Sequence, residues 1–161
     1  MHKIKWGIIG SGNIAKAFAH SIKYCQNSEL TSVFGRNSEM VDQFSTKFDI
    51  AAFTDLDEFI SSNNIDAVYI ATPHNSHYFY SLEAIKNNKH VLCEKPLTMN
   101  YLESMTLLNL AKEAELFLME AYMYRTHPQT FNTLEHLDIF KNTKEKIFIE
   151  SSFGFSAELP K

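Results

Sequence analysis

The sequence has 161 residues and a net charge of −4, with 15 Lys and Arg against 19 Asp and Glu; a chain of this length usually forms one domain with at most a short extension. The weak acidity argues against a nucleic-acid-binding protein, which usually carries a basic patch. Hydrophobic residues make up 45% of the chain and charged residues only 21%, which excludes an intrinsically disordered protein.

Short apolar runs alternate with segments of helical periodicity along the chain. We expect strands at 4–9, 30–34, 51–53, 67–71, 90–93 and 116–121, of which 51–53 is the weakest. We expect helices at 13–24, 38–48, 55–62, 76–87, 101–114 and 129–140. Continuously apolar strands that alternate with helices are typical of a parallel sheet covered on both faces. Because the crossovers are right-handed, the predicted fold is α/β with a doubly wound parallel sheet.

The end of the chain breaks this alternation. Residues 147–155 are predicted to form one more strand, and only six residues follow it. We interpret it as the first strand of a unit that this chain does not go on to build. Such a strand leaves backbone groups unpaired at its edge, so we expect copies of the chain to associate through it as a homo-oligomer.

Two further features bear on where the protein works. The two cysteines, Cys25 and Cys93, lie far apart and exclude a disulfide framework, so we expect a reducing, cytoplasmic environment. No apolar run approaches the roughly 18–20 residues that a membrane span needs. The apolar stretch from Trp6 to Gly10 is too short for the core of a signal peptide.

The first strand runs into a glycine-rich loop, Gly-Ser-Gly-Asn-Ile-Ala, at residues 10–15. Gly10 permits a tight turn, Gly12 lets the backbone approach a pyrophosphate, and Ala15 lets the helix pack on the strand. The helix N-terminus offers free N–H groups to the phosphates. The alternative is a plain strand–helix turn, but the position in a strand–helix unit of about 30 residues favours dinucleotide binding. The expected contacts are Gly10, Ser11, Gly12, Asn13 and Ile14.

The end of the second strand should carry the residue that selects the cofactor, about 20 residues past the loop. Gly35, Arg36 and Asn37 occupy this place, and none of them is an acid that could bind the ribose of NAD. Arg36 offers a permanently charged, planar fork that suits a phosphate, and Gly35 has no side chain to crowd it. NADP is therefore predicted as the cofactor and NAD is disfavoured, although Arg36 could instead stack on adenine or lie in solvent.

Three further segments carry a family resemblance: Tyr-Ile-Ala-Thr-Pro-His-Asn-Ser-His at 69–77, His-Val-Leu-Cys-Glu-Lys-Pro-Leu at 90–97, and Glu-Ala-Tyr-Met-Tyr-Arg-Thr-His-Pro-Gln at 120–129. With the glycine loop, the first two resemble the N-terminal half of the glucose–fructose oxidoreductase/inositol dehydrogenase/MocA (Gfo/Idh/MocA) family. The third is similar to its NADP-linked dihydrodiol and xylose dehydrogenase branch. The resemblance implies a Rossmann dinucleotide-binding domain and an oxidoreductase that acts on a sugar, polyol or diol.

The resemblance also assigns roles to individual residues. Glu94 and Lys95 would lie at the nicotinamide, and Lys95 would contact the reacting substrate hydroxyl. An ammonium group stabilises a developing alkoxide, and a partly desolvated lysine can have its pKa lowered enough to pass a proton. The family tends to have a cis peptide before Pro96, which a proline tolerates. The residues that would line the cofactor beyond the pyrophosphate are Thr72, Pro73, Asn75 and His77.

Alternatives remain for several of these residues. Lys95 could be an ordinary surface lysine, and Cys93 is expected to be a small buried strand residue. His74 and His77 have the spacing of a metal-binding pair, but no further ligands accompany them, so no metal is expected. Arg125 could bind cofactor or substrate, or could form a structural ion pair.

Complete members of the resembled family continue into a second, mixed-sheet domain with the substrate pocket and a catalytic histidine. The implied division is a Rossmann domain at 1–123 and, at 124–161, a connecting helix and first strand of a truncated second domain. Three hypotheses follow: a truncated NADP-dependent dehydrogenase that binds cofactor with little turnover, a stand-alone NADP-binding regulatory module, or a half-enzyme that needs a partner chain. The sequence leaves the substrate and the reaction direction open.

Overall fold

The computed structural model describes residues 3–138 together with Phe148, Glu150 and Ser152. The chain divides into two units, Met1–Tyr122 and Met123–Lys161. In the second unit a short 3₁₀ helix, η3 (Met123–Thr126), precedes α6 (Pro128–Asp138). The predicted strand at 147–155 falls almost wholly outside the described residues. The three residues described there belong to no helix or strand, and the strand stays a prediction.

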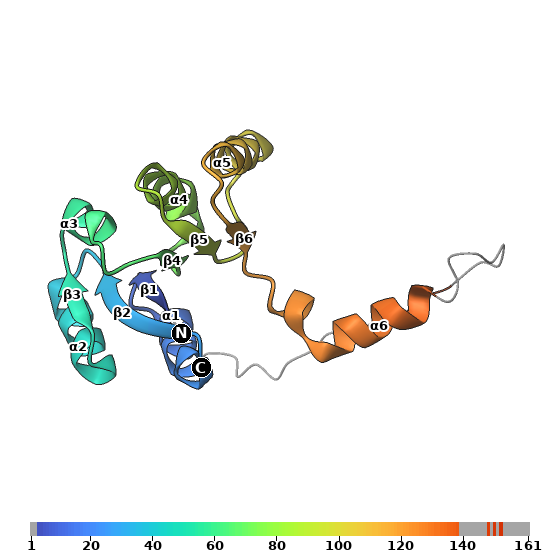
Figure 1. Ribbon diagram of the computed structural model, residues 1–161, viewed down its shortest axis with the longest axis horizontal. Coiled ribbons are helices and arrows are strands. Elements are labelled where there is room, and N and C mark those ends of the chain that lie inside the picture. The colour runs from blue at the N-terminus through green and yellow to red at the C-terminus, as the bar shows by residue number, and fades with distance from the viewer. Residues whose placement is uncertain (1–2, 139–147, 149, 151, 153–161) are drawn as a thin grey trace, which may run out of the picture. The chain divides into compact units, whose positions relative to one another are not determined.

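A six-stranded sheet forms the centre of the first unit (Figure 1). Its strands are β1 (Ile4–Ile9), β2 (Ser28–Phe34), β3 (Ala51–Phe53), β4 (Ala67–Ile70), β5 (His90–Cys93) and β6 (Leu118–Glu120). All neighbouring strands pair in parallel, in the order β3-β2-β1-β4-β5-β6. The chain winds outward in both directions from β1, so β1 and β4 flank the switch point where open α/β sheets bind ligands. The predicted doubly wound α/β fold is confirmed.

The helices of this unit fall where the apolar periodicity predicts them. They are α1 (Asn13–Ser21), α2 (Ser38–Phe48), α3 (Leu56–Ser61), α4 (His77–Lys86) and α5 (Tyr101–Glu113). The predicted first helix ends as a 3₁₀ turn, η1 (Ile22–Tyr24), and η2 (His74–Ser76) precedes α4. Such tightened turns are frequent at helix ends, where backbone groups lack intrahelical partners. No helix in the described part of the chain is both long and apolar enough to cross a membrane.

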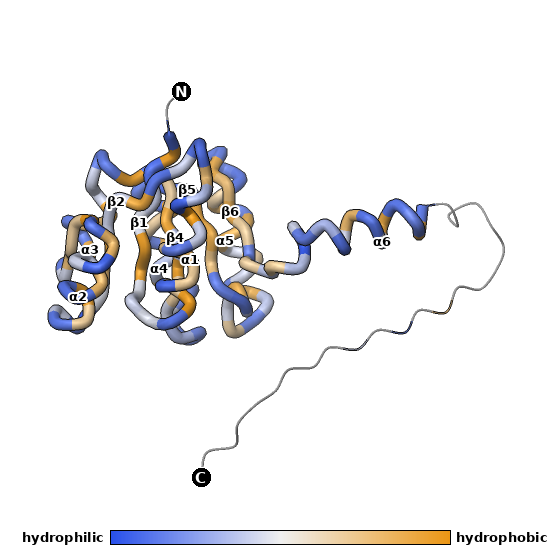
Figure 2. The backbone as a smooth tube through the Cα atoms, turned by 90° about the horizontal axis from the view of Figure 1, so that it is seen from below, coloured by the Kyte–Doolittle hydropathy of each residue, from blue (hydrophilic) through white to orange (hydrophobic). Residues whose placement is uncertain are grey.

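Two separate cores hold the helices to the sheet. Phe59 of α3, Ala84 of α4 and Leu107 of α5 pack on one face, and α1 and α2 pack on the other (Figure 1). Successive strand residues alternate between these cores: Ile8 lies in one and Ile9 in the other, both fully buried. In Figure 2 the most hydrophobic segments of the backbone trace lie in the strands of the sheet. Each large apolar side chain buried here contributes roughly 1.5–3 kcal/mol.

Candidate cofactor-binding site

A cavity of about 310 Å³ lies at the carboxyl ends of β1, β2 and β4. This is the edge that the switch point of the sheet predicts for a ligand. Six of the residues expected from the sequence line it: Gly10, Ser11, Gly12, Arg36, Thr72 and Pro73. Residues that the sequence analysis did not assign to the site also line it, among them Phe34, Met40, Ser76 and Tyr80.

The two loop glycines have different reasons to be glycine. Gly10 has φ +105°, and an added Cβ would lie 2.7 Å from the carbonyl oxygen of Ala71, so the fold itself excludes a side chain there. Gly12 has an ordinary φ of −74°, and an added Cβ would meet no atom of the described residues within 4 Å. Neither backbone geometry nor packing requires glycine at position 12. The open space beside it fits a ligand that approaches the backbone closely, as a dinucleotide pyrophosphate does.

The N-terminus of α1 is left without a side-chain cap. Gly12 is its N-cap residue and the first turn holds no acidic residue. Helices α2, α3 and α5 are instead capped by the side chains of Asn37, Asp55 and Asn100, each of which accepts a backbone N–H. The first-turn N–H groups of α1, where Asn13 and Ile14 lie, therefore remain available to an anion.

Arg36 follows β2 and immediately precedes the N-terminus of α2. Its side chain is exposed, and within the described residues it makes no hydrogen bond or ion pair. Gly35 borders the cavity beside Arg36, and a Cβ at this position would lie 2.8 Å from Cγ2 of Val41. The close packing of α2 is therefore one structural reason for glycine at position 35, and the room it leaves for a phosphate stays a prediction.

His77 lies at the start of α4 and is fully buried. Its Nδ1 lies 2.7 Å from the carbonyl oxygen of Pro96, and its Nε2 lies 2.9 Å from that of Thr72. The ring does not line the cavity as the resemblance implied; it joins the segment after β4 to the segment after β5. With both ring nitrogens engaged, His77 is also unsuited to pair with the exposed His74 on a metal. Among the described residues, no cluster of three His, Cys, Asp or Glu side chains could hold one.

Glu94 and Lys95 follow β5. The Tyr69 hydroxyl donates to Glu94 Oε1 over 2.6 Å, and the Tyr69 ring stacks on Phe18 with centroids 4.1 Å apart. Burial, reinforced by the Glu94 carboxylate, raises the pKa of Tyr69, so the hydroxyl stays protonated and remains a donor. The Lys95–Pro96 peptide is cis, as predicted. The side chain of Lys95 is exposed, so the partial desolvation expected of it is not seen in this unit.

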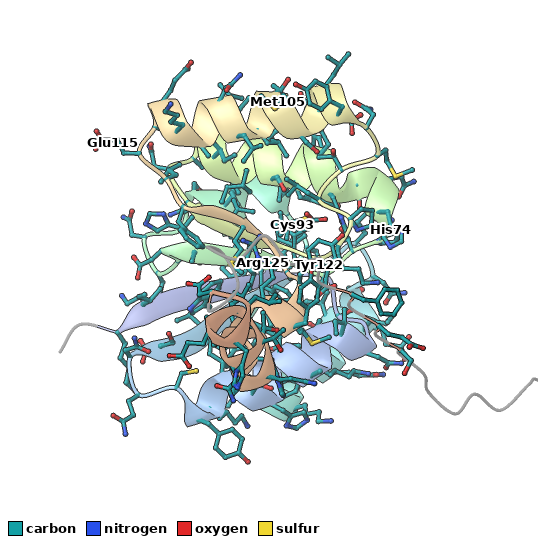
Figure 3. The ribbon with its side chains drawn as sticks, turned by 90° about the vertical axis from the view of Figure 1, so that its right-hand side faces the viewer. His74, Cys93, Met105, Glu115, Tyr122 and Arg125 are labelled. Carbon is teal, nitrogen blue, oxygen red and sulfur yellow. The ribbon has the colours of Figure 1, made fainter. Side chains whose placement is uncertain are left out.

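The remaining expected residues lie as follows. Asn75 is exposed on η2, and Arg125 is exposed on η3 of the second unit. Cys93 is fully buried, as expected, and burial raises the pKa of its thiol to about 12. Figure 3 shows His74 and Glu115 at opposite ends of the sheet, with Cys93 between them. The cavity lies at the His74 end, since Thr72, Pro73 and Ser76 line it.

Two contacts near this edge were not anticipated from the sequence. Tyr69 lies in the apolar run 67–71 and opens the motif at 69–77, and neither pattern indicates that its hydroxyl donates to Glu94. Glu120, at the end of β6, accepts the backbone N–H of Leu97 over 2.8 Å. The sequence carries a weak signal for both contacts, since Tyr69 and Glu120 each bring a polar group close to the carboxyl end of an otherwise apolar strand.

The fold and this cavity define a Rossmann-type NAD(P)-binding domain. Residues 4–122 match the family model described as "Oxidoreductase family, NAD-binding Rossmann fold". The chain therefore belongs to the Gfo/Idh/MocA family of oxidoreductases, as the motif resemblance predicts.

Named relatives give the scale of this match. The chain is 36% identical over 135 residues to the scyllo-inositol 2-dehydrogenase (NADP(+)) IolU of Bacillus subtilis, covering 83% of this chain and 41% of the relative. It is 30% identical over 153 residues to a trans-1,2-dihydrobenzene-1,2-diol dehydrogenase of Xenopus tropicalis, covering 93% of this chain and 46% of the relative. The crystal structure of KijD10, a 3-ketoreductase from Actinomadura kijaniata in complex with NADP and TDP-benzene, is 29% identical, with a TM-score of 0.80 and coverage of 86% and 43%. The chain thus spans less than half the length of each.

Proposed function

We propose that this chain binds NADP(H) in the cavity beside the glycine loop. It would be the nucleotide-binding part of an oxidoreductase that moves hydride between the nicotinamide and a hydroxyl or carbonyl of a sugar, polyol or diol. The observation that carries the proposal is Gly12: no contact among the described residues requires glycine there, and its backbone borders the cavity. The uncapped N-terminus of α1 supplies N–H donors for the pyrophosphate.

The preference for NADP rests on Arg36. The guanidinium is exposed, lacks a partner among the described residues, and lies on the cavity beside the N-terminus of α2. A permanently charged fork and a helix N-terminus together favour a phosphate dianion on the adenosine ribose. The names of IolU and of the KijD10 complex, which both refer to NADP, support this preference.

The reacting end of the cofactor is assigned to Glu94 and Lys95. The nicotinamide, when bound, supplies the hydride chemistry. Lys95 would hold or pass a proton at the substrate oxygen, and its ammonium would stabilise negative charge there. The Tyr69 hydroxyl fixes the Glu94 carboxylate beside it. The names of the inositol and dihydrobenzenediol dehydrogenases support a polyol or diol substrate.

We propose little turnover by these 161 residues alone, because the chain matches less than half of each relative. The free Cys25 and Cys93 fit a cytoplasmic, reducing environment. Two other arrangements predict different observations. A regulatory NADP-binding module would bind tightly as a monomer without turnover of any polyol. A half-enzyme would gain turnover when its partner chain is added.

The test is a titration with NADPH and NADH that follows Trp6 emission. Trp6 is the only tryptophan of the chain, and its ring contacts Phe18, which stacks on Tyr69 near the site. We expect quenching by NADPH with a dissociation constant in the micromolar range, and binding of NADH weaker by about tenfold or more.

The Arg36→Ala variant should weaken NADPH binding by about 10- to 100-fold, because a hydrogen-bonded charge pair is lost, and should leave NADH binding unchanged. Lys112→Ala is the matched control, since it removes an exposed cation from the last turn of α5, away from the cavity. Equal weakening of both cofactors would refute the phosphate role of Arg36. A folded protein that binds neither would refute the proposed function.

A further inference from the structure

The Glu94 carboxylate keeps acceptor positions free at the carboxyl edge of the sheet. Its Oε1 accepts the Tyr69 hydroxyl over 2.6 Å, and its Oε2 accepts the backbone N–H of Lys95 over a longer 3.3 Å. Within the part of the chain that the structure describes, no cation forms an ion pair with this carboxylate. Because an ionised carboxylate offers about four acceptor positions, roughly two of them remain for another donor.

The sheet topology places Glu94 where the second half of a dinucleotide would lie. The cavity beside the glycine loop borders the ends of β1, β2 and β4. A dinucleotide crosses the switch point of the sheet, so its other half lies over the strands beyond β1. These strands are β4 and β5, and the Glu94 N–H extends their pairing by donating to the Ile70 carbonyl over 2.9 Å. A carboxylate at such an edge can accept hydrogen bonds from ribose hydroxyls.

Tyr69 is itself held in place by its packing. Its side chain is buried, and its ring stacks on Phe18 of α1 with centroids 4.1 Å apart. Helix α1 is also the helix whose uncapped N-terminus is available to the pyrophosphate. The hydrogen bond from the Tyr69 hydroxyl to a carboxylate is charge-assisted and therefore stronger than one between neutral groups. Tyr69 thus ties Glu94 to the same helix that the glycine loop begins.

We propose that Tyr69 is a positioning residue for the nicotinamide end of the cofactor, because it holds Glu94 where the carboxylate can accept a hydroxyl of the nicotinamide ribose. The inference rests on the proposed function, since it concerns the same cofactor. Tyr69 does not line the cavity, so it acts on the ligand through Glu94. Holding a flexible side chain in place before binding removes the cost of ordering it when the ligand arrives.

The test is a double-mutant cycle measured by isothermal titration calorimetry with two ligands. NADPH carries the nicotinamide ribose, whereas adenosine 2′,5′-bisphosphate is the other half of the same cofactor without it. We expect Tyr69→Phe to weaken NADPH binding by about three- to tenfold, and Glu94→Ala by about tenfold or more. The double variant should bind NADPH within about twofold of Glu94→Ala, because the two residues act as one unit.

The bisphosphate separates positioning from a general structural role. Tyr69→Phe keeps the ring that stacks on Phe18, so every variant should bind the bisphosphate as the wild type does. Tyr78→Phe is the matched control, because Tyr78 packs partly buried on the opposite core and its hydroxyl makes no hydrogen bond within the described residues. This control should bind both ligands with wild-type affinity.

A measurement without cofactor tests the hydrogen bond itself. In ¹H NMR spectra at neutral pH we expect a slowly exchanging Tyr69 hydroxyl proton, assigned by its absence from Tyr69→Phe. The proton should exchange faster in Glu94→Ala, because that variant lacks its acceptor. Equal exchange rates in the wild type and in Glu94→Ala would overturn the proposal, whether or not the cofactor binds.

The remaining outcomes distinguish this inference from the proposed function. Additive losses of NADPH affinity in the double variant, or an equal loss for the bisphosphate in Tyr69→Phe, would refute the positioning role and leave cofactor binding intact. A folded wild type that binds neither ligand would refute the proposed function, and the positioning role with it. Should Tyr69→Phe not fold, unchanged NADPH affinity in Glu94→Ala would still overturn the proposal.

Discussion

Replacing Gly12 with alanine is expected to abolish tight cofactor binding while leaving the fold intact. Within the part of the chain that the structure describes, the new methyl group meets no atom within 4 Å, and the φ of −74° is one that alanine adopts freely. The same methyl group projects where the backbone would otherwise approach a pyrophosphate. Gly10 provides the contrasting case, because its φ is +105° and a Cβ would lie 2.7 Å from Ala71 O.

The magnitudes follow from these geometries. Alanine restricts the unfolded chain, which stabilises Gly12→Ala by ~0.4–1 kcal/mol. Alanine is a poorer N-cap residue than glycine, which offsets a similar amount. The net change in free energy of unfolding should therefore stay within about 1 kcal/mol. Gly10→Ala should lower the free energy of unfolding by about 2 kcal/mol or more. The unfavourable backbone conformation costs roughly 1–3 kcal/mol, and the new Cβ also clashes with backbone that cannot move aside.

The assay pairs urea unfolding with NADPH titration of the same samples. For Gly12→Ala we expect an unfolding midpoint near that of the wild type and at least tenfold weaker NADPH binding, about 1.4 kcal/mol. For Gly10→Ala we expect a clear fall in the midpoint. Wild-type NADPH affinity in Gly12→Ala would refute the pyrophosphate role of the loop. A loss of stability in Gly12→Ala as large as in Gly10→Ala would refute the claim that the protein itself does not need that glycine.

Two further predictions concern buried groups with raised pKa values. The folded-state pKa of Tyr69 lies above its ordinary value of about 10, so the stability it contributes is complete below about pH 10 and is lost as pH rises toward the folded-state value. Tyr69→Phe also removes the hydrogen-bond donor of Glu94, and it should lose less stability at alkaline pH than the wild type, as measured by urea unfolding. An unchanged loss would show that the alkaline loss of stability does not come from Tyr69. Burial raises the pKa of the Cys93 thiol to about 12, so a thiol reagent at neutral pH should modify the exposed Cys25 alone until the protein is unfolded. Equal reaction rates for both thiols in the folded protein would show that Cys93 is accessible.

Local features of the site could be predicted from the sequence because neighbouring residues decide them. The apolar runs at 4–9 and 90–93 form β1 and β5 with the predicted bounds, since a strand buried on both faces needs continuous apolar residues. The glycine loop lies between β1 and α1 because its motif combines a turn and a helix start. The cis peptide before Pro96 was likewise expected from the motif around it.

Other features depend on contacts between distant parts of the chain. The Tyr69–Glu94 hydrogen bond joins residues 25 positions apart, and its formation depends on the parallel pairing of β4 with β5. The role of Gly35 depends on how closely α2 packs against the end of β2. The apolar run that contains Tyr69 and the glycine at position 35 do not indicate these contacts, because each contact needs a partner from another element.

The sequence by itself determined the alternation of strands and helices, the phosphate loop and the family, because these follow from local periodicity and short motifs. Only the tertiary structure decided which side chains border the cavity and which side chains join the segments around it by hydrogen bonds. His77 illustrates the difference, since the family resemblance implies a cofactor contact, yet the ring is fully buried between two carbonyl oxygens. The physical reason is that a side chain's surroundings are set by sheet register and helix packing, which bring together residues that the sequence separates.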